Sequence, residues 1–115
     1  MDVNGIQQEL EKFAKERDWN QYHSPKNLAM ALSVEAAELL EHFQWLTQEQ
    51  SAGLDAKTLE DVAAEIADIQ IYLLRLADKL HINLESAVHE KIAENRRKYP
   101  TEKVKGSAAK YTAYE

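Results

Sequence analysis

Glycine and proline are scarce in this chain, and their positions divide it into lengths suited to helices. Among 115 residues there are three glycines and two prolines. They stand at Gly5, Pro25, Gly53, Pro100 and Gly106. Because both residue types disfavour helix interiors, each long segment between them can hold an uninterrupted helix. No segment shows the alternation of apolar and polar residues that would predict a strand. The sequence therefore predicts an all-α fold.

Four helices are expected within a single domain over residues 1–100. Ser24 followed by Pro25 is a typical helix start, because serine is a good N-cap and proline suits the first helical position. Thr58 and Asp61 resemble a weak capping box for the third helix. In chain order, the four helices should cover about residues 3–17, 25–46, 58–79 and 84–98. We predict a four-helix bundle-like domain, followed by a flexible C-terminal tail over residues 101–115.

Two pairs of carboxylates lie on expected helices, Glu35 with Glu38 and Glu65 with Asp68. Residues three apart share a helix face, so two such helices packed together could bring four carboxylates to one point. Glu35 falls in the middle of an apolar stripe, where an ionised carboxylate is costly unless it is paired or bound to metal. The chain has no cysteine, which leaves carboxylate and histidine as the strong ligands and favours hard, oxygen-preferring metals.

Composition limits the kinds of partner. A formal net charge of −6 argues against a nucleic acid polymer, because such binding depends on lysine and arginine neutralising phosphates. The first residues form neither a basic start nor an apolar run, and no apolar stretch is long enough to span a bilayer. We therefore expect a cytoplasmic protein that binds neither membrane nor nucleic acid.

The third helix is apolar on nearly all sides. Ala63, Ala67, Ile71 and Leu74 lie opposite its main apolar stripe. A domain of this size can rarely bury such a helix on two sides by itself. The sequence thus predicts a homo-oligomer, either a homodimer or a homotetramer.

The spacing of the carboxylate pairs resembles a known family. Glu-x-x-Glu, then 26 intervening residues, then Glu-x-x-Asp is similar to the all-α nucleoside triphosphate pyrophosphohydrolases of the MazG type. The likeness covers roughly residues 5–100, and its further segments resemble the branch containing the dCTP pyrophosphatases. These segments are Arg17-Asp18-Trp19, His23-Ser24-Pro25-Lys26-Asn27-Leu28, Phe43-Gln44-Trp45 and Asn95-Arg96-Arg97-Lys98-Tyr99-Pro100.

The resemblance implies cleavage of a nucleoside triphosphate between the α and β phosphates, giving the monophosphate and pyrophosphate, in nucleotide pool cleaning. It implies that Glu35, Glu38, Glu65 and Asp68 hold Mg²⁺. Magnesium prefers carboxylates, water and phosphate oxygens, in agreement with those residues. We choose Glu38 as the catalytic base that accepts a proton from the attacking water.

The resemblance also suggests Lys91, Asn95 and Tyr99 as phosphate and sugar contacts. These residues are spaced four apart, so they form a ridge on one face of the fourth helix. The simpler interpretation of Lys91 is a side chain that extends along an apolar face to reach solvent.

Four further residues are candidates for a base pocket. They are Trp19, His23, Trp45 and Tyr72. An aromatic face can stack on a pyrimidine, while a polar edge reads its exocyclic groups. Ordinary core packing is the competing interpretation of both tryptophans. Leu10 stands where vertebrate relatives carry a histidine, which leaves the preferred base open.

Two other functions fit the carboxylate pairs less well. A di-iron carboxylate bundle usually pairs Glu-x-x-His motifs, whereas both pairs here end in carboxylates. A non-catalytic helical interaction module could use the acidic ridge to bind a basic partner. This module would gain no stability from added magnesium.

Overall fold

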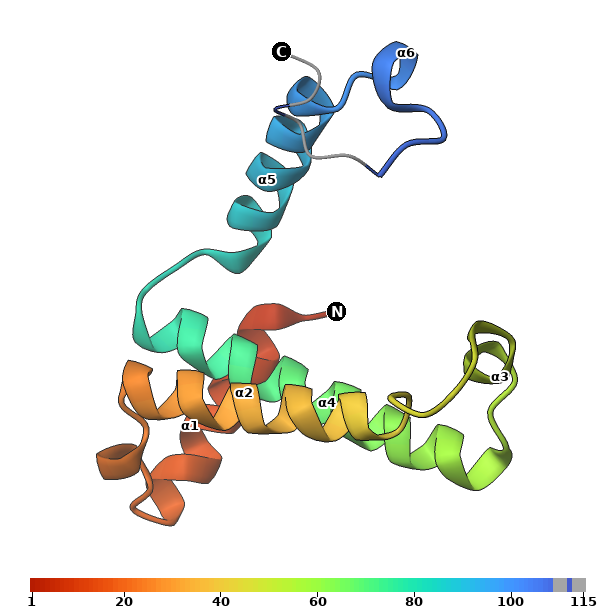
Figure 1. Cartoon of the computed structure of the whole chain (residues 1–115). Helices are drawn as coiled ribbons and strands as arrows, with labels where there is room; N and C mark the ends of the chain where they lie inside the picture. Colours follow the sequence, from red (N-terminus) through yellow and green to blue (C-terminus); the bar gives the residue numbers. More distant parts are fainter. Residues whose placement is uncertain (109–111, 113–115) are drawn as a thin grey trace. The chain divides into compact units, whose positions relative to one another are not determined.

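The structure, a computed structural model, describes residues 1–108 and 112 and is all-α, as predicted (Figure 1). No strand occurs among these residues. The four long helices are α1 (Val3–Glu16), α2 (Pro25–Glu41), α4 (Ala56–Lys79) and α5 (Leu84–Lys98). The short elements are a 3-10 turn, η1 (Asn20–Tyr22), and the helices α3 (Gln48–Ala52) and α6 (Thr101–Val104).

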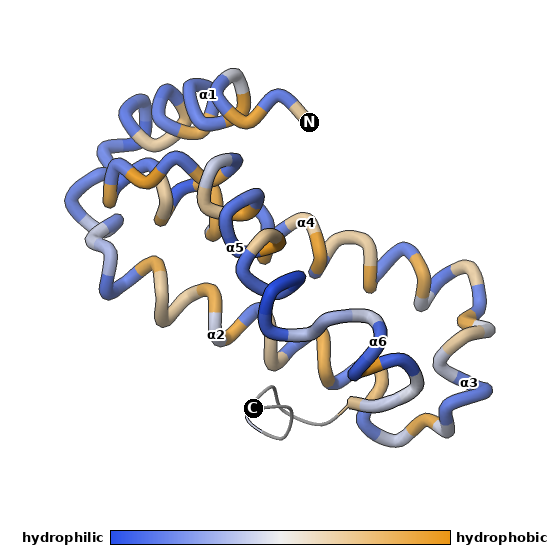
Figure 2. The backbone as a smooth tube through the Cα atoms, turned by 90° about the horizontal axis from the view of Figure 1, so that it is seen from above, coloured by the Kyte–Doolittle hydropathy of each residue, from blue (hydrophilic) through white to orange (hydrophobic). Residues whose placement is uncertain are grey.

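The first compact unit runs from Met1 to Ile82 and is built around α4. This helix packs along α2 and, on another side, against α1. Hydrophobic positions recur along both α2 and α4 (Figure 2). The buried apolar side chains are Ala14, Leu28, Val62, Leu74 and Ala77. Because α2 and α4 lie side by side, the carboxylate pairs that they carry are brought together.

The second helix starts as predicted but ends earlier. Ser24 caps it by accepting a hydrogen bond from the backbone N–H of Asn27 at 3.1 Å, with Pro25 as the first helical residue. The prediction that it reaches residue 46 is wrong. After Glu41 the backbone N–H groups of residues 43 and 44 both donate to the carbonyl of Leu40, each at 2.9 Å, which closes the helix in a turn.

A short helix that the sequence analysis missed follows this turn. Thr47 and Gln50 form a full capping box, in which each side chain accepts a hydrogen bond from the backbone N–H of the other residue, at 3.0 and 3.1 Å. The helix α3 begins there. Trp45 consequently lies in the connection between α2 and α3.

The predicted cap of the third long helix is also wrong. Asp55 is the N-cap of α4 and accepts a hydrogen bond from the N–H of Thr58 at 2.8 Å. Asp61 instead pairs with Lys57 at 3.1 Å. The helix therefore begins at Ala56, and aspartate provides the cap that had been assigned to Thr58.

The second unit begins at Asn83. The predicted domain over residues 1–100 with a flexible tail over residues 101–115 stays a prediction. Asn83 caps α5 by accepting from the N–H of Ser86 at 3.0 Å. The helix α6 lies within the segment predicted to be a tail. Residues 109–111 and 113–115 of that predicted tail are outside the described residues. Within the described ranges, no helix combines the length and apolar character needed to cross a membrane.

Candidate functional site

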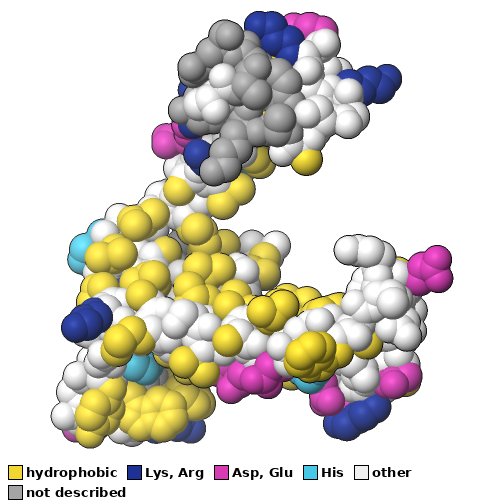
Figure 3. Space-filling view, in the orientation of Figure 1, with side chains coloured by type: hydrophobic (Ala, Val, Ile, Leu, Met, Phe, Trp, Pro, Cys, Tyr) yellow, Lys and Arg dark blue, Asp and Glu magenta, His cyan; other side chains and the backbone are white. Residues whose placement is uncertain are grey.

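Three carboxylates meet where α2 and α4 pack together. Glu35 and Glu38 come from α2 and Glu65 comes from α4, and we call them the acidic trio. One carboxylate oxygen from each residue lies within 4.8 Å of the corresponding atoms of the other two. Figure 3 shows acidic side chains exposed along this layer, bordered by hydrophobic ones. The predicted convergence of the two helices is present for these three residues.

Two oxygens of the acidic trio lack hydrogen-bond partners. Oε2 of Glu35 and Oε2 of Glu65 are buried, and neither has a partner among the described residues. Buried polar atoms in native proteins are nearly always satisfied, because an unpaired one is costly. Divalent cations such as Mg²⁺ take oxygen ligands, so a cation would satisfy both atoms. The donor set therefore fits a hard metal ion.

Close contact between the carboxyl groups of the acidic trio raises two pKa values. The pKa of Glu35 is raised, mainly because the carboxyl group of Glu65 lies against it, then through desolvation and the charge of Asp68. The pKa of Glu38 is raised mainly by the neighbouring carboxyl of Glu35. Crowded carboxylates disfavour each other's ionised form and favour the approach of positive charge. Asp68 is outside the trio but is close enough to act on Glu35.

A pocket of about 370 Å³ includes Asp68 in its lining. Its lining residues come from α1, α4 and the segment that joins α1 to α2. They are Glu9, Leu10, Phe13, Trp19, His23, Asp68, Ile71, Tyr72 and Arg75. Asp68 lines the pocket and also acts electrostatically on Glu35, so it connects the pocket with the acidic trio. The pocket volume falls within the range of small-molecule sites, about 300–1,000 Å³.

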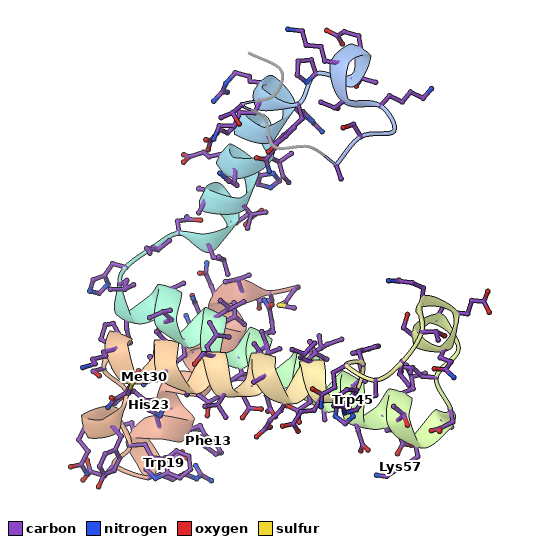
Figure 4. The ribbon with its side chains drawn as sticks, in the orientation of Figure 1. Phe13, Trp19, His23, Met30, Trp45 and Lys57 are labelled. Carbon is purple, nitrogen blue, oxygen red and sulfur yellow. The ribbon has the colours of Figure 1, made fainter. Side chains whose placement is uncertain are left out.

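Aromatic rings form one wall of the pocket. The rings of Phe13 and Trp19 meet edge to face with centroids 5.6 Å apart, and the His23 ring is 6.4 Å from Trp19. The guanidinium of Arg17 lies over Phe13, 3.6 Å from the ring centroid. Figure 4 shows Phe13, Trp19 and His23 gathered at one end of the unit. Such a wall can stack on a planar ring.

The structure brings together three of the four predicted base-pocket residues. Trp19, His23 and Tyr72 all line the pocket, as does Leu10. Trp45 lies apart from this cluster, and 86% of its surface is exposed (Figure 4). The assignment of Trp45 to a base pocket stays a prediction.

Arg75 is a site residue that the sequence analysis missed. Only 3% of its surface is exposed, and its guanidinium donates to Glu11 and Asn20 and, from Nε, to Nδ1 of His23 at 3.1 Å. Lys79 supports the same cluster by donating to Oδ1 of Asn20 at 3.2 Å. The signal in the sequence is an arginine inside the apolar run of α4, two helical turns after Asp68.

The predicted phosphate contacts belong to the second unit. On α5, Lys91 and Asn95 are exposed, and Nζ of Lys91 lies 3.3 Å from Oε2 of Glu94. Tyr99 is the C-cap of α5, where its N–H donates to the carbonyl of Asn95 at 2.9 Å. The phosphate and sugar roles of Lys91, Asn95 and Tyr99 stay predictions.

This chain is similar to known proteins both in sequence and in structure. The model described as "MazG-like family" matches residues 30–113. The chain is 44% identical over 104 residues to dCTP pyrophosphatase 1 of Mus musculus and 41% identical over 103 residues to the Homo sapiens protein of that name. A crystal structure of a pyrophosphatase from Archaeoglobus fulgidus superposes with a TM-score of 0.77 at 42% identity, covering 87% of this chain and 94% of that one.

The chain belongs to the MazG-like family. Each of the two mammalian matches covers 88% of this chain. The chain spans 61% of the length of those relatives.

Proposed function

We propose that this protein is a nucleoside triphosphate pyrophosphohydrolase that uses Mg²⁺ to convert deoxynucleoside triphosphates, dCTP among them, into the monophosphate and pyrophosphate. The observation that carries the proposal is the acidic trio, with two buried and unpartnered oxygens, beside an aromatic-walled pocket. Membership of the MazG-like family and the names of the relatives support the same activity.

The acidic trio and Asp68 are the proposed metal ligands. The acidic trio offers closely spaced oxygens, and Asp68 extends this negative surface to the rim of the pocket. When bound there, Mg²⁺ supplies charge compensation for a polyphosphate and lowers the pKa of a coordinated water. The same positive charge would favour the ionised forms of Glu35 and Glu38, whose pKa values are raised in the crowded acidic trio.

Glu38 is the proposed general base. A general base must lie within reach of the attacking water, and Glu38 belongs to the cluster at which that water would be held. Glu38 would take the proton of the water that attacks the triphosphate, and the pyrophosphate would leave. Glu38 therefore has two proposed roles, as ligand and as base.

The pocket is the proposed binding site of the nucleotide base. Trp19 and Phe13 offer aromatic surface for stacking, while His23 and Tyr72 provide polar groups along the same lining. A small polar-edged ring such as cytosine matches this combination of surfaces. The triphosphate would then extend past Asp68 towards the acidic trio.

Self-association is part of the proposal. Large apolar side chains are exposed on both helices that carry the acidic trio, including Val34 and Leu40 on α2 and Leu59 and Ile66 on α4, each more than half exposed. Exposed apolar surface of this extent is typical of an interface. We propose a homodimer or homotetramer acting in the cytoplasm, where its triphosphate substrates occur.

A substrate panel tests the activity. The purified protein is incubated with Mg²⁺ and each of dCTP, dTTP, dATP, dGTP and CTP, and the products are resolved by ³¹P NMR. We expect dCMP and pyrophosphate from dCTP, and loss of turnover in Glu38→Gln. Glu60→Gln, which changes an exposed glutamate on α4 outside the acidic trio, is the matched control and should keep full activity. Formation of dCDP and orthophosphate, or no hydrolysis of any triphosphate, would contradict the proposal.

A further inference from the structure

The hydrogen bond between Arg75 and His23 determines which nitrogen of the imidazole carries its proton. The guanidinium Nε–H lies 3.1 Å from Nδ1 of His23. Arginine has donors and no acceptor, so Nδ1 must be the unprotonated nitrogen of a neutral ring. The proton of that ring is then on Nε2. In the part of the chain that the structure describes, Nε2 has no hydrogen-bond partner.

The neutral form of His23 is favoured by its surroundings. Its pKa is lowered, first by desolvation and then by the positive charges of Arg75 and Lys79. Glu11 opposes this effect only weakly, because its carboxylate is engaged by the guanidinium. The pKa of Glu11 is lowered by its hydrogen bonds from Arg75 and Asn20, so it stays ionised. A neutral histidine and an ionised glutamate are therefore joined through one buried arginine.

The orientation of Arg75 is itself fixed. Its Nη1 donates to Glu11 and its Nη2 donates to Asn20, while the amide of Asn20 donates to Oε1 of Glu11 at 3.0 Å. These bonds engage both Nη atoms of the guanidinium, and the remaining donor, Nε–H, is directed at His23. A planar guanidinium held in this way cannot rotate without breaking charge-assisted hydrogen bonds.

We propose that Arg75 is a positioning residue that holds His23 as the neutral Nε2–H tautomer, so that His23 presents a hydrogen-bond donor to an acceptor on the base of a bound nucleotide. The proposal rests on the proposed function, because it assigns the nucleotide base to this pocket. His23 and Arg75 both line the pocket, and the Trp19 ring beside His23 provides a stacking surface. A pyrimidine carbonyl oxygen or ring nitrogen is an acceptor that matches Nε2–H. Without Arg75 the ring could exchange its proton between the two nitrogens and offer an acceptor in place of the donor.

The tautomer can be measured directly in the wild-type protein. Long-range ¹H–¹⁵N correlation spectra of the imidazole rings distinguish a protonated from an unprotonated nitrogen, and a His23→Gln spectrum assigns the signals. We expect Nδ1 of His23 unprotonated and Nε2 protonated at neutral pH. Addition of dCMP, without metal, should shift the Nε2–H resonance. A proton on Nδ1 overturns the proposal without any need for an Arg75 variant to fold.

Kinetics of paired variants test the role of Arg75. Arg75→Met keeps the length of the side chain and removes the donor to His23. Lys57→Met is the control, because Lys57 lies on the same helix, pairs with Asp61 and does not line the pocket. We expect Arg75→Met to lose the single tautomer and to raise KM for dCTP about three- to tenfold, the worth of one hydrogen bond, with little change in kcat. Lys57→Met should keep both the tautomer and KM.

A substrate without a base separates positioning from general damage. For 2-deoxyribose 5-triphosphate, which lacks the base, KM should be the same in wild type and Arg75→Met. An equal rise of KM for this substrate, or an Arg75→Met protein that keeps the tautomer, overturns the proposal. If the wild type cleaves no triphosphate, the proposed function fails, while the spectra and the dCMP titration still decide on the positioning role of Arg75.

Discussion

Binding of a divalent cation should raise the thermal stability of the protein. One ion at a concentration of about 100 times its Kd stabilises the folded state by about 2.7 kcal/mol if it does not bind the unfolded chain. The acidic trio lies in the unit from Met1 to Ile82. For a unit of that size, each kcal/mol corresponds to about 4–8 °C in Tm. Saturating Mg²⁺ should therefore raise the Tm of this unit by about 10–20 °C.

Differential scanning calorimetry in EDTA and in increasing Mg²⁺ measures this gain. Glu65→Gln should have a higher Tm than the wild type in EDTA, because one source of repulsion is removed, yet it should lose most of the gain from Mg²⁺. Glu60→Gln lies on the same helix outside the acidic trio and should behave like the wild type in both conditions. An equal Mg²⁺ gain in Glu65→Gln, or no gain in the wild type, would refute the reasoning.

Three further outcomes follow from single residues. Leu74→Ala should lower the free energy of unfolding, measured with urea, by about 2–5 kcal/mol, because Leu74 is 1% exposed. Leu59→Ala, at a position that is 57% exposed, should lower it by less than about 1 kcal/mol. Equal losses would contradict the assigned core. Because the folded-state pKa of His23 is lowered by desolvation and by Arg75, the unfolded chain takes up the proton first as pH falls below about 6.5. The stability of the wild type should then decrease relative to that of His23→Gln as the pH falls from 7 to 5. An increase would show that the pKa of His23 is raised in the folded state. Thr47→Ala removes an N-cap worth about 0.5–2 kcal/mol, so hydrogen exchange at the backbone amide of residue 50 should be faster by about two- to thirtyfold. An unchanged exchange rate would mean that the capping box does not stabilise α3.

The long helices were predictable because local signals define them. The scarcity of glycine and proline, the Ser24–Pro25 start and the Asn83 cap are all short-range features, and the structure contains each of them. The end of α2 was not predictable from apolar spacing, since Phe43 and Leu46 continue the stripe beyond Glu41. A tight backbone turn at Leu40 ends the helix there.

The acidic trio was predictable in outline because helical spacing puts Glu35 and Glu38 on one face and an apolar stripe directs that face inward. Which carboxylates converge depends on the register of α2 against α4. That register is a property of packing, and it places Glu65 in the acidic trio and Asp68 at the rim of the pocket.

The cluster around Arg75 could not be found from sequence spacing. Glu11 comes from α1, Asn20 and His23 come from the segment that joins α1 to α2, and these residues meet Arg75 on α4 only in the folded unit. No local pattern connects residues more than 50 positions apart in the chain, as Arg75 is from each of these partners. An arginine among the leucines of α4 was the available clue.

We propose that the acidic trio holds the cation on which the triphosphate is cleaved. A crystal of the protein with Mn²⁺ and a dCTP analogue carrying a non-hydrolysable α,β-imido link tests it most directly, by anomalous diffraction at the manganese edge. We predict an anomalous peak bonded to oxygens of Glu35, Glu38 and Glu65, with a phosphate oxygen of the analogue in the same coordination shell. A manganese peak elsewhere, or an acidic trio engaged by basic side chains and holding no ion, would contradict the account.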